Sequence, residues 1–252
     1  MTTTLTTPAP VRPDVRRTDP SLPTLVGIEM RKSLSTRSGK ALAATAMFLA
    51  PVAAALMAAT SGEPPDLVAE PIGVLGLLTA CTTIALGVLS TAGEWTHRTV
   101  QTTFLLVPSR GRVVAAKLAA VGLLGAAFAA VSTGLTTGAL AAIVGDTSWA
   151  GAGRAAGIAV VAGAVFAVVG AGVGAALANT PASLTGLYLL LLGVIPLMAE
   201  FAPQVAGRLD LTRAVLALEQ GGAVGQPVAV VAGWVVVPAV AGWLVTRRRA
   251  VQ

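Results

Sequence analysis

The chain has 252 residues, of which 55% are hydrophobic and 11% are charged, and its formal net charge is +6. A soluble domain carries roughly 25% charged residues, so this composition excludes a water-soluble globule and is typical of a lipid-solvated helix bundle. We expect the excess positive charge to set orientation in a membrane rather than to bind nucleic acid.

The N-terminal part of the chain precedes any long apolar run. Residues 1–23 repeat proline and threonine without an apolar period, which predicts a disordered cytoplasmic tail and no cleaved signal peptide. In residues 24–40, apolar side chains alternate with Glu29, Arg31 and Lys32. This pattern predicts an amphipathic helix on the cytoplasmic membrane surface, with a solvated charged linker as the alternative.

Six apolar segments follow, each long enough to cross a membrane as a helix. They cover about 41–60, 71–91, 113–144, 154–178, 183–199 and 227–246. The third is longer than a bilayer requires, so we expect it to tilt or to extend beyond the lipid. The mixed segment 200–226 is expected to hold a short interfacial or re-entrant helix, and residues 247–252 form a second tail. The predicted fold class is all-α: a polytopic bundle of six transmembrane helices with an interfacial N-terminal helix.

The distribution of basic residues predicts that both ends of the chain are cytoplasmic. Of the 17 Lys and Arg residues, only Arg154, Arg208 and Arg213 fall outside the N-terminal segment, the connection after the second span and the C-terminal tail. Positive charge is retained on the cytoplasmic side of a membrane, and this arrangement requires an even number of spans. We therefore expect a multi-pass plasma-membrane protein.

The connection between the second and third spans is the most distinctive stretch of the sequence. Its residues EWTHRTVQTTFLLVPSRGRVVAAK begin at Glu94, and an apolar centre of Phe104, Leu105 and Leu106 precedes Pro108. A cytoplasmic helix with such a centre is expected to present a surface to another protein. An ordinary positively charged loop that fixes topology is the alternative.

This connection resembles the permease subunits of type 2 ABC exporters. The shared pattern is Glu-aromatic-x-x-x-Thr, then Leu-x-x-Pro-x-x-Arg, then Ala-Lys. This chain departs from it at the arginine, because Arg110 lies one residue before the expected position and Arg112 one residue after it. The residues that carry it are Glu94, Trp95, Thr99, Leu105, Pro108, Arg110 or Arg112, Ala116 and Lys117, together with Glu29, Arg31 and Lys32 before the first span. The six-span layout is similar too.

The resemblance implies a coupling role and a set of partners. Residues 94–110 would contact a cytoplasmic ABC ATPase subunit and relay its closure to the spans, and residues 24–40 would form an interfacial elbow helix. The residues expected to couple are Glu94, Trp95, Thr99, Phe104, Leu105, Leu106, Pro108 and Arg110. A second copy or a similar permease would complete the transporter, and the apolar walls suit export of a hydrophobic or amphipathic substrate.

No catalytic motif is present, so we do not expect an enzyme. Gly39-Lys40 is followed by Ala41, and Leu34 occupies the position of the first glycine of a Walker loop, so ATP hydrolysis requires a separate subunit. His97 is the single histidine and has no partner set for a metal or a nucleophile. We expect neither a metal nor a cofactor.

Three further features have structural explanations. Cys81 lies in an apolar run and is expected to act as a small buried hydrophobe. Glu200 is expected to be solvated at the outer interface, although acids inside a membrane are functional candidates. GxxxG spacings suit close helix packing, within the chain or across a dimer, and occur at Gly134/Gly138, Gly153/Gly157 and Gly170/Gly174.

Two other functions stay open. One is a non-transporting membrane scaffold or immunity protein that binds another membrane protein. The other is an ion- or proton-coupled secondary transporter, which usually needs acids within the spans and often has internal repeats. The first four predicted spans show neither feature.

Overall fold

The computed structural model describes residues 20–60, 66–143 and 147–249, and these residues are helical with no β-strand. Six helical stretches are long and apolar enough to cross a membrane, which confirms the predicted all-α polytopic bundle. They are α2 (Arg37–Thr60), α3 (Ala69–Thr96), α5 (Arg110–Ile143), α6 (Ala152–Leu177), the composite of α7 (Thr180–Leu189), η1 (Leu190–Val194) and α8 (Ile195–Phe201), and α11 (Gly225–Arg248). Each predicted span falls within one of these helices to within one residue. Most of the predicted tail 1–23, and residues 250–252, lie outside the described residues.

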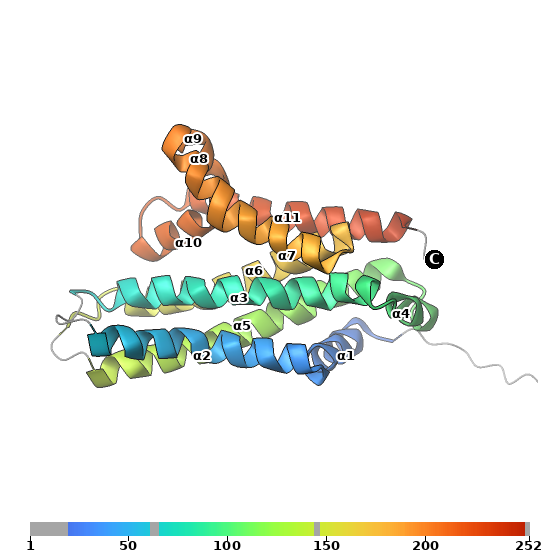
Figure 1. The fold of residues 1–252 in the computed structure, drawn as a ribbon, viewed down its shortest axis with the longest axis horizontal. Coiled ribbons are helices and arrows are strands. Elements are labelled where there is room, and N and C mark those ends of the chain that lie inside the picture. The colour runs from blue at the N-terminus through green and yellow to red at the C-terminus, as the bar shows by residue number, and fades with distance from the viewer. Residues whose placement is uncertain (1–19, 61–65, 144–146, 250–252) are drawn as a thin grey trace, which may run out of the picture.

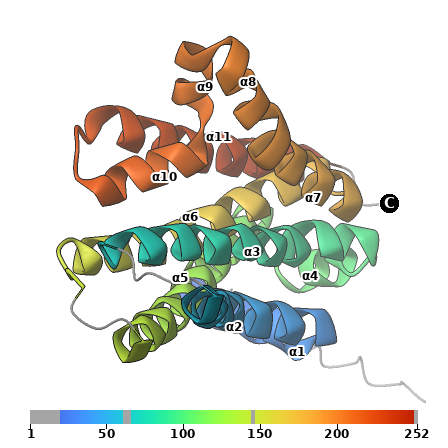
Figure 2. The same ribbon diagram turned by 60° about the vertical axis from the view of Figure 1, so that its left-hand side comes forward.

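The long helices form three layers (Figures 1 and 2). The central layer consists of α3 and α6, which contact each other more extensively than any other pair of helices. On one side lie α2 and α5, and on the other lie α7, α8 and α11. The segment 200–226 contains the two short helices α9 (Pro203–Leu209) and α10 (Leu211–Gln220), and α10 packs against α11, α6 and α3.

Small and hydroxyl-bearing residues allow the central pair to pack closely. A methyl group at Gly87 would overlap the Ala167 carbonyl of α6, and one at Gly170 would overlap the Ile84 carbonyl of α3. Such close approach lets polar side chains bond across the interface, where lipid cannot compete. Two threonines of α3 donate to α6 carbonyls: Thr83 to Gly163 (2.9 Å) and Thr91 to Ala171 (3.0 Å).

Among the described residues, one of the three GxxxG spacings packs against another helix. Gly170 and Gly174 of α6 lie against α3, whereas nothing lies within 4 Å of a methyl group built at the remaining four positions. The open spacings are Gly134/Gly138 on α5 and Gly153/Gly157 on α6.

The fifth span begins at a capped turn and contains a wide π-helical turn. Ala178 adopts a left-handed conformation (φ 53°), and Asn179 accepts a hydrogen bond from the Ala182 N–H (2.9 Å), so Pro181 opens α7 as well as ending α6. Further along, the Ile195 N–H bonds five residues back to Leu190, immediately before Pro196. A π turn next to proline is one way in which a membrane helix accommodates the missing donor.

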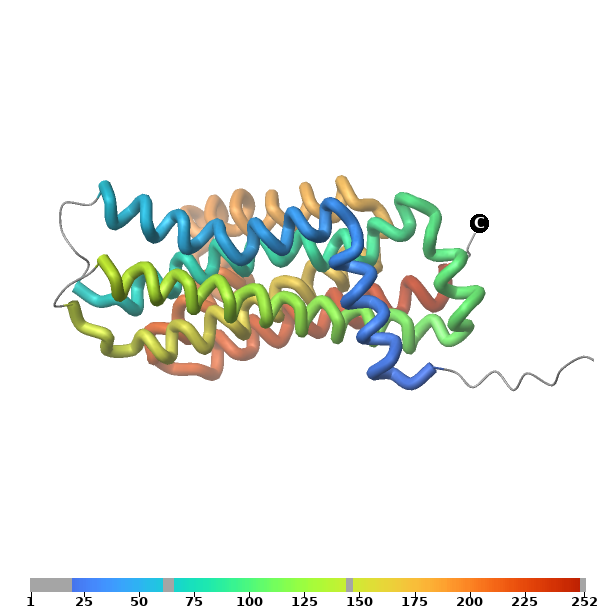
Figure 3. The backbone as a smooth tube through the Cα atoms, turned by 90° about the horizontal axis from the view of Figure 1, so that it is seen from below, coloured from blue at the N-terminus to red at the C-terminus, as the bar shows by residue number. Residues whose placement is uncertain are grey.

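The N-terminal helix is shorter than expected and is separate from the first span. α1 (Leu22–Ser35) ends before Thr36, which is extended (φ −84°, ψ 154°), and the Thr36 hydroxyl accepts a hydrogen bond from the Gly39 N–H (3.0 Å). Thr36 therefore caps α2, and residues 37–40 belong to α2 rather than to the predicted 24–40 helix. α1 crosses the N-terminal part of α5 at a steep angle (Figure 3).

Candidate functional site

One end of the bundle gathers segments from across the chain. α1, the end of α3, the short helix α4 (Val100–Leu106), the start of α5 and the end of α11 lie together there (Figures 1 and 3). The connection that the sequence singled out is α4 with its flanking turns. The candidate functional site is this end of the bundle.

A tight reversal places α4 beneath the bundle. Arg98 is left-handed (φ 57°) and follows the last turn of α3. The Thr99 N–H donates to the Glu94 carbonyl (2.9 Å) and the Arg98 N–H donates to the Trp95 carbonyl (3.2 Å). This is the Schellman pattern, which usually has glycine at the left-handed position. The chain therefore reverses here on an arginine that carries a backbone strain.

A buried network of four charges joins α1, α3 and α5. Lys117 Nζ lies 2.6 Å from Glu29 Oε2 and 2.7 Å from Glu94 Oε1, and it also donates to the Ser90 carbonyl (3.2 Å). Lys32 donates to the same Glu94 oxygen. Glu29, Glu94 and Lys117 are 8%, 7% and 5% exposed.

The network is balanced in charge and reaches α4. Two carboxylates face two ammonium groups, so no described member is left without a counter-charge. A buried charge is costly unless it is paired and hydrogen-bonded, which makes the geometry of this network demanding. Lys32 also lies 3.4 Å from the Thr103 hydroxyl of α4. A displacement of α4 would therefore be felt by ion pairs inside the bundle.

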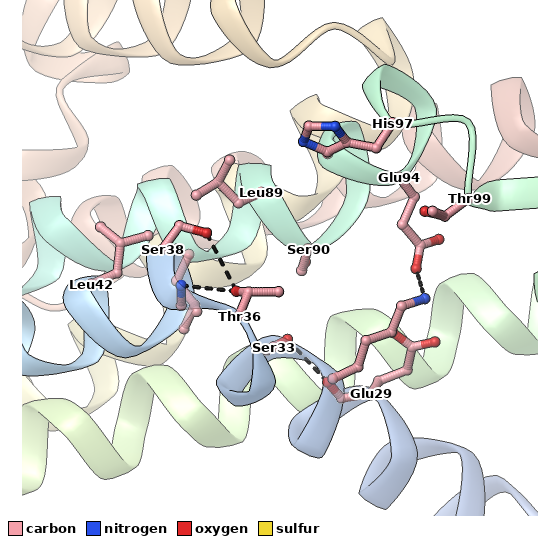
Figure 4. Close-up of a pocket in the computed structure, with 14 residues that line it drawn as sticks. Glu29, Ser33, Thr36, Ser38, Leu42, Leu89, Ser90, Glu94, His97 and Thr99 are labelled. Atoms are coloured by element: carbon pink, nitrogen blue, oxygen red, sulfur yellow. Dashed lines mark hydrogen bonds and ion pairs between the residues drawn. The ribbon is translucent and has the colours of Figure 1, made fainter.

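A cavity of about 350 Å³ opens beside this network (Figure 4). The carboxylates of Glu29 and Glu94 line it together with hydroxyl groups such as that of Thr36, and Leu42 and Leu89 are among the residues that give it apolar walls. A mixed lining of this kind suits a ligand with both polar and apolar parts. Over the described residues, no cluster of histidine, cysteine or acidic residues could hold a metal ion.

Stacked arginines fasten α4 to the ends of α3, α5 and α11. The Trp95 and Phe104 rings meet edge to face, 6.4 Å between centroids. Arg110 lies over Phe104 (5.0 Å) and Arg249 over Trp95 (5.2 Å), and Arg110 donates to the Arg249 carbonyl (2.6 Å). Cation–π contacts of this kind orient side chains as well as attract them.

The two faces of α4 differ sharply. On the inner side, Val107 is buried with Leu25 of α1 and Val113 of α5, and Phe104 packs against this cluster. On the outer side, Leu105 and Leu106 are 77% and 75% exposed. Two adjacent leucines this exposed on one short helix form an apolar surface with no partner in the described chain.

Several predicted site residues lie in other elements or environments than the sequence predicted. Glu94 and Trp95 belong to the last turn of α3, and Arg110 is the first residue of α5, so only Val100–Leu106 forms a separate helix. Glu29 and Lys32 point into the bundle instead of facing water, because Lys117 and Glu94 lie there.

The remaining predicted residues range from exposed to fully buried. Arg31, Thr99 and Pro108 are exposed. Arg112 donates to the Pro20 carbonyl (2.6 Å), and Ala116 is fully buried.

Lys117 is the member of the network whose importance the sequence analysis missed. It matched the family pattern but was not expected to be a coupling residue. The signal was present, because a single lysine followed by a long apolar stretch usually needs an acidic partner inside the membrane.

Two residues that the sequence singled out lie outside this end of the bundle. Glu200 is exposed on α8. Cys81 is half-buried against the main core cluster, and its carbonyl accepts a hydrogen bond from the Tyr188 hydroxyl (2.9 Å). Neither residue is part of the charge network. Comparison with known proteins adds no assignment, since no family model and no curated protein matches the chain.

Proposed function

We propose that this chain is the membrane-spanning permease subunit of a type 2 ABC exporter. In this proposal, α4 docks on a separate cytoplasmic ATPase subunit, and α1 is the interfacial elbow helix. The observation that carries the proposal is the pair of exposed leucines on α4, a helix that contacts the bundle through Phe104 and through the bond between Thr103 and Lys32 of the ion-pair network.

The arrangement of α4 is what force transmission requires. A partner that pushes on Leu105 and Leu106 acts on a helix whose inner face contacts α1 and α5. Thr103 contacts Lys32, which is paired with Glu94 at the end of α3. Interfaces of this type convert small shifts into rearrangements because packed elements move as units.

The charge distribution supports a cytoplasmic position for this end. Of the 14 described Lys and Arg residues, 11 lie at this end, in α1, the start of α2, the turn before α4, the start of α5 and the end of α11. Positive charge is retained on the cytoplasmic side. Both termini would then be cytoplasmic, in the plasma membrane.

The environment of Gly39-Lys40 supports a separate source of ATP hydrolysis. These residues lie in the first turn of α2, where the Gly39 N–H is bonded to Thr36 rather than available to a phosphate. Energy would come from a partner ATPase, and a second copy of the chain or a similar permease would complete the path. The substrate would be hydrophobic or amphipathic.

The decisive experiment is co-purification with a measured activity. The tagged chain is isolated from membranes of its source, and ATP hydrolysis in the eluate is compared for the wild type and a Leu105→Ala/Leu106→Ala variant. We expect about a tenfold loss of co-purifying ATPase activity, since exposed apolar anchors dominate such interfaces. The matched control is Leu56→Ala/Leu189→Ala, which removes two similarly exposed leucines from spans.

Sidedness provides an independent check. In a Cys81→Ala background, a single cysteine introduced at Leu105 should react with a membrane-impermeant maleimide only in inside-out vesicles. Labelling of intact cells, or an eluate without ATPase activity, would contradict the exporter assignment. A scaffold or a secondary transporter would then be the better description.

A further inference from the structure

A second cavity lies at the same end of the bundle, on the side away from the charge network. It has a volume of about 640 Å³, opens widely to the outside, and is bordered by the start of α5, the end of α11 and the first residue of α1. Arg110, Arg112 and Arg247 line it with Trp243 and Ser109, and none of its described lining residues is acidic. Arg110 and Arg247 give the cavity a positive charge.

The depth of this cavity corresponds to the headgroup layer of a membrane. α5 begins with Arg110 and Arg112 and is apolar from Val113 onward, and α11 changes from apolar to basic at Arg247. Basic and tryptophan side chains concentrate at this level because they satisfy both the polar and the apolar phase. A ligand here would be reached from the lipid as well as from water.

Arg110 contacts a backbone carbonyl and Arg247 contacts an aromatic ring, and neither contact neutralises the arginine's charge. Arg110 donates to the Arg249 carbonyl (2.6 Å), and Arg247 lies 4.4 Å from the Trp243 ring centroid. In the described chain neither is ion-paired with a carboxylate. Oriented guanidinium groups are the side chains best suited to bind phosphate oxygens in pairs.

Ser109 adds a hydroxyl-bearing residue to the wall of the cavity. Its oxygen is buried and has no hydrogen-bond partner among the described residues, whereas buried polar atoms are nearly always paired. Because this oxygen is closed to solvent, it would have to rotate toward the cavity to donate to a phosphate oxygen.

We propose that the cavity binds the phosphate headgroup of an anionic phospholipid. Basic pockets between transmembrane helices on the cytoplasmic side bind such headgroups. A lipid fits better than a free phosphate because Val240 and Leu244 continue the stripe of Arg247 along α11 and are both exposed. This apolar stripe gives the acyl chains a surface directly below the headgroup. The site is independent of any ATPase partner.

Tryptophan quenching tests the proposal directly. The protein is placed in phosphatidylcholine nanodiscs with a small fraction of phosphatidylglycerol that has brominated acyl chains, and the part of the quenching lost in Trp243→Phe is assigned to Trp243. We expect brominated phosphatidylglycerol to quench Trp243 several-fold more than brominated phosphatidylcholine at the same fraction. Arg247→Gln should lower this preference about fivefold, and Arg110→Gln by a similar factor.

The controls distinguish a specific binding site from a general effect of surface charge. Arg37→Gln removes an exposed arginine outside the cavity at the same end and should leave the preference unchanged. Equal quenching by both lipids, or an equal effect of Arg37→Gln and Arg247→Gln, would overturn the proposal. Loss of the preference in millimolar inorganic phosphate would show that the cavity takes free phosphate, which also overturns the lipid assignment.

Discussion

The two ends of the bundle handle buried charge in different ways. At the α4 end, Glu29 and Glu94 are buried against Lys117 with short ion pairs. At the other end, Glu219 of α10 lies against Gly73 of α3, and its Oε1 has no hydrogen-bond partner among the described residues. The difference teaches that one end pairs its buried carboxylates with ammonium groups, whereas the other holds a carboxyl without such a partner among the described residues.

Burial alone explains the state of Glu219. It raises the pKa of this carboxyl from 4.5 to about 7. Arg154 donates its Nε to the neighbouring Leu218 carbonyl (2.8 Å) rather than to the carboxylate. Among the described residues, Glu219 therefore lacks the counter-charge that Lys117 provides at the α4 end.

We expect the substitution of Lys117 to have the largest effect on stability, because it removes the counter-charge that distinguishes the α4 end. Lys117→Met leaves Glu29 without a cation and Glu94 with Lys32 alone, so we expect a loss of about 3 kcal/mol in the free energy of unfolding. Denaturant unfolding in detergent measures it. Lys40→Met, at an exposed position of the same end, is the matched control and should change little.

A compensating change distinguishes charge from packing. Adding Glu29→Gln to Lys117→Met removes the unpaired carboxylate and should recover a large part of the loss. If the double variant is less stable than the single one, the pairing of Lys117 with Glu29 is not what holds α1 in place.

Neutralising Glu219 tests whether the carboxyl at the opposite end of the bundle makes stability depend on pH. A carboxyl with a raised pKa stabilises the folded chain when protonated, and this contribution is lost as the pH rises toward and through 7. After allowing for solvent screening, the wild type should lose about 1 kcal/mol of stability between about pH 5 and pH 8. Glu219→Gln should flatten this dependence and be the more stable protein at the upper pH.

Thermal unfolding across this pH range measures the effect. Glu200→Gln removes an exposed acid from α8 and should keep the wild-type slope. Identical slopes for the wild type and Glu219→Gln would mean that another group titrates.

The turn at Arg98 should give the smallest effect. Arg98→Gly relieves the left-handed strain at φ 57° and should stabilise the fold by about 0.5–1 kcal/mol. Arg98→Ala removes the same charge but keeps the Cβ atom, so it should not stabilise. Equal stabilisation by both changes would assign the effect to charge.

The sequence was sufficient for the architecture because length and apolar character act locally. Each of the six long helices, and the position of α4 between Arg98 and Pro108, follows from runs of apolar residues and their breaks. The start of α2 was harder to predict from the sequence, because it depends on the extended conformation of Thr36, whose hydroxyl accepts a hydrogen bond from the Gly39 N–H.

The site was only partly predictable because its contacts are distant in sequence. An amphipathic pattern alone assigns Glu29 and Lys32 to solvent. Their partners Lys117 and Glu94 lie 88 and 62 residues away, and only the packing of α1 across α5 brings them together. The Arg249 contact to Trp95 is more distant still.

The π turn at Leu190–Val194 has a consequence for how sequence length can vary. A π turn holds one residue more than the α-helical turn it replaces, so it is an insertion absorbed inside a continuous helix. Deleting a single residue there should return the segment to regular α-helix without shifting its ends. Most single deletions within the other long helices would rotate every later side chain by about 100°, out of register with its neighbours.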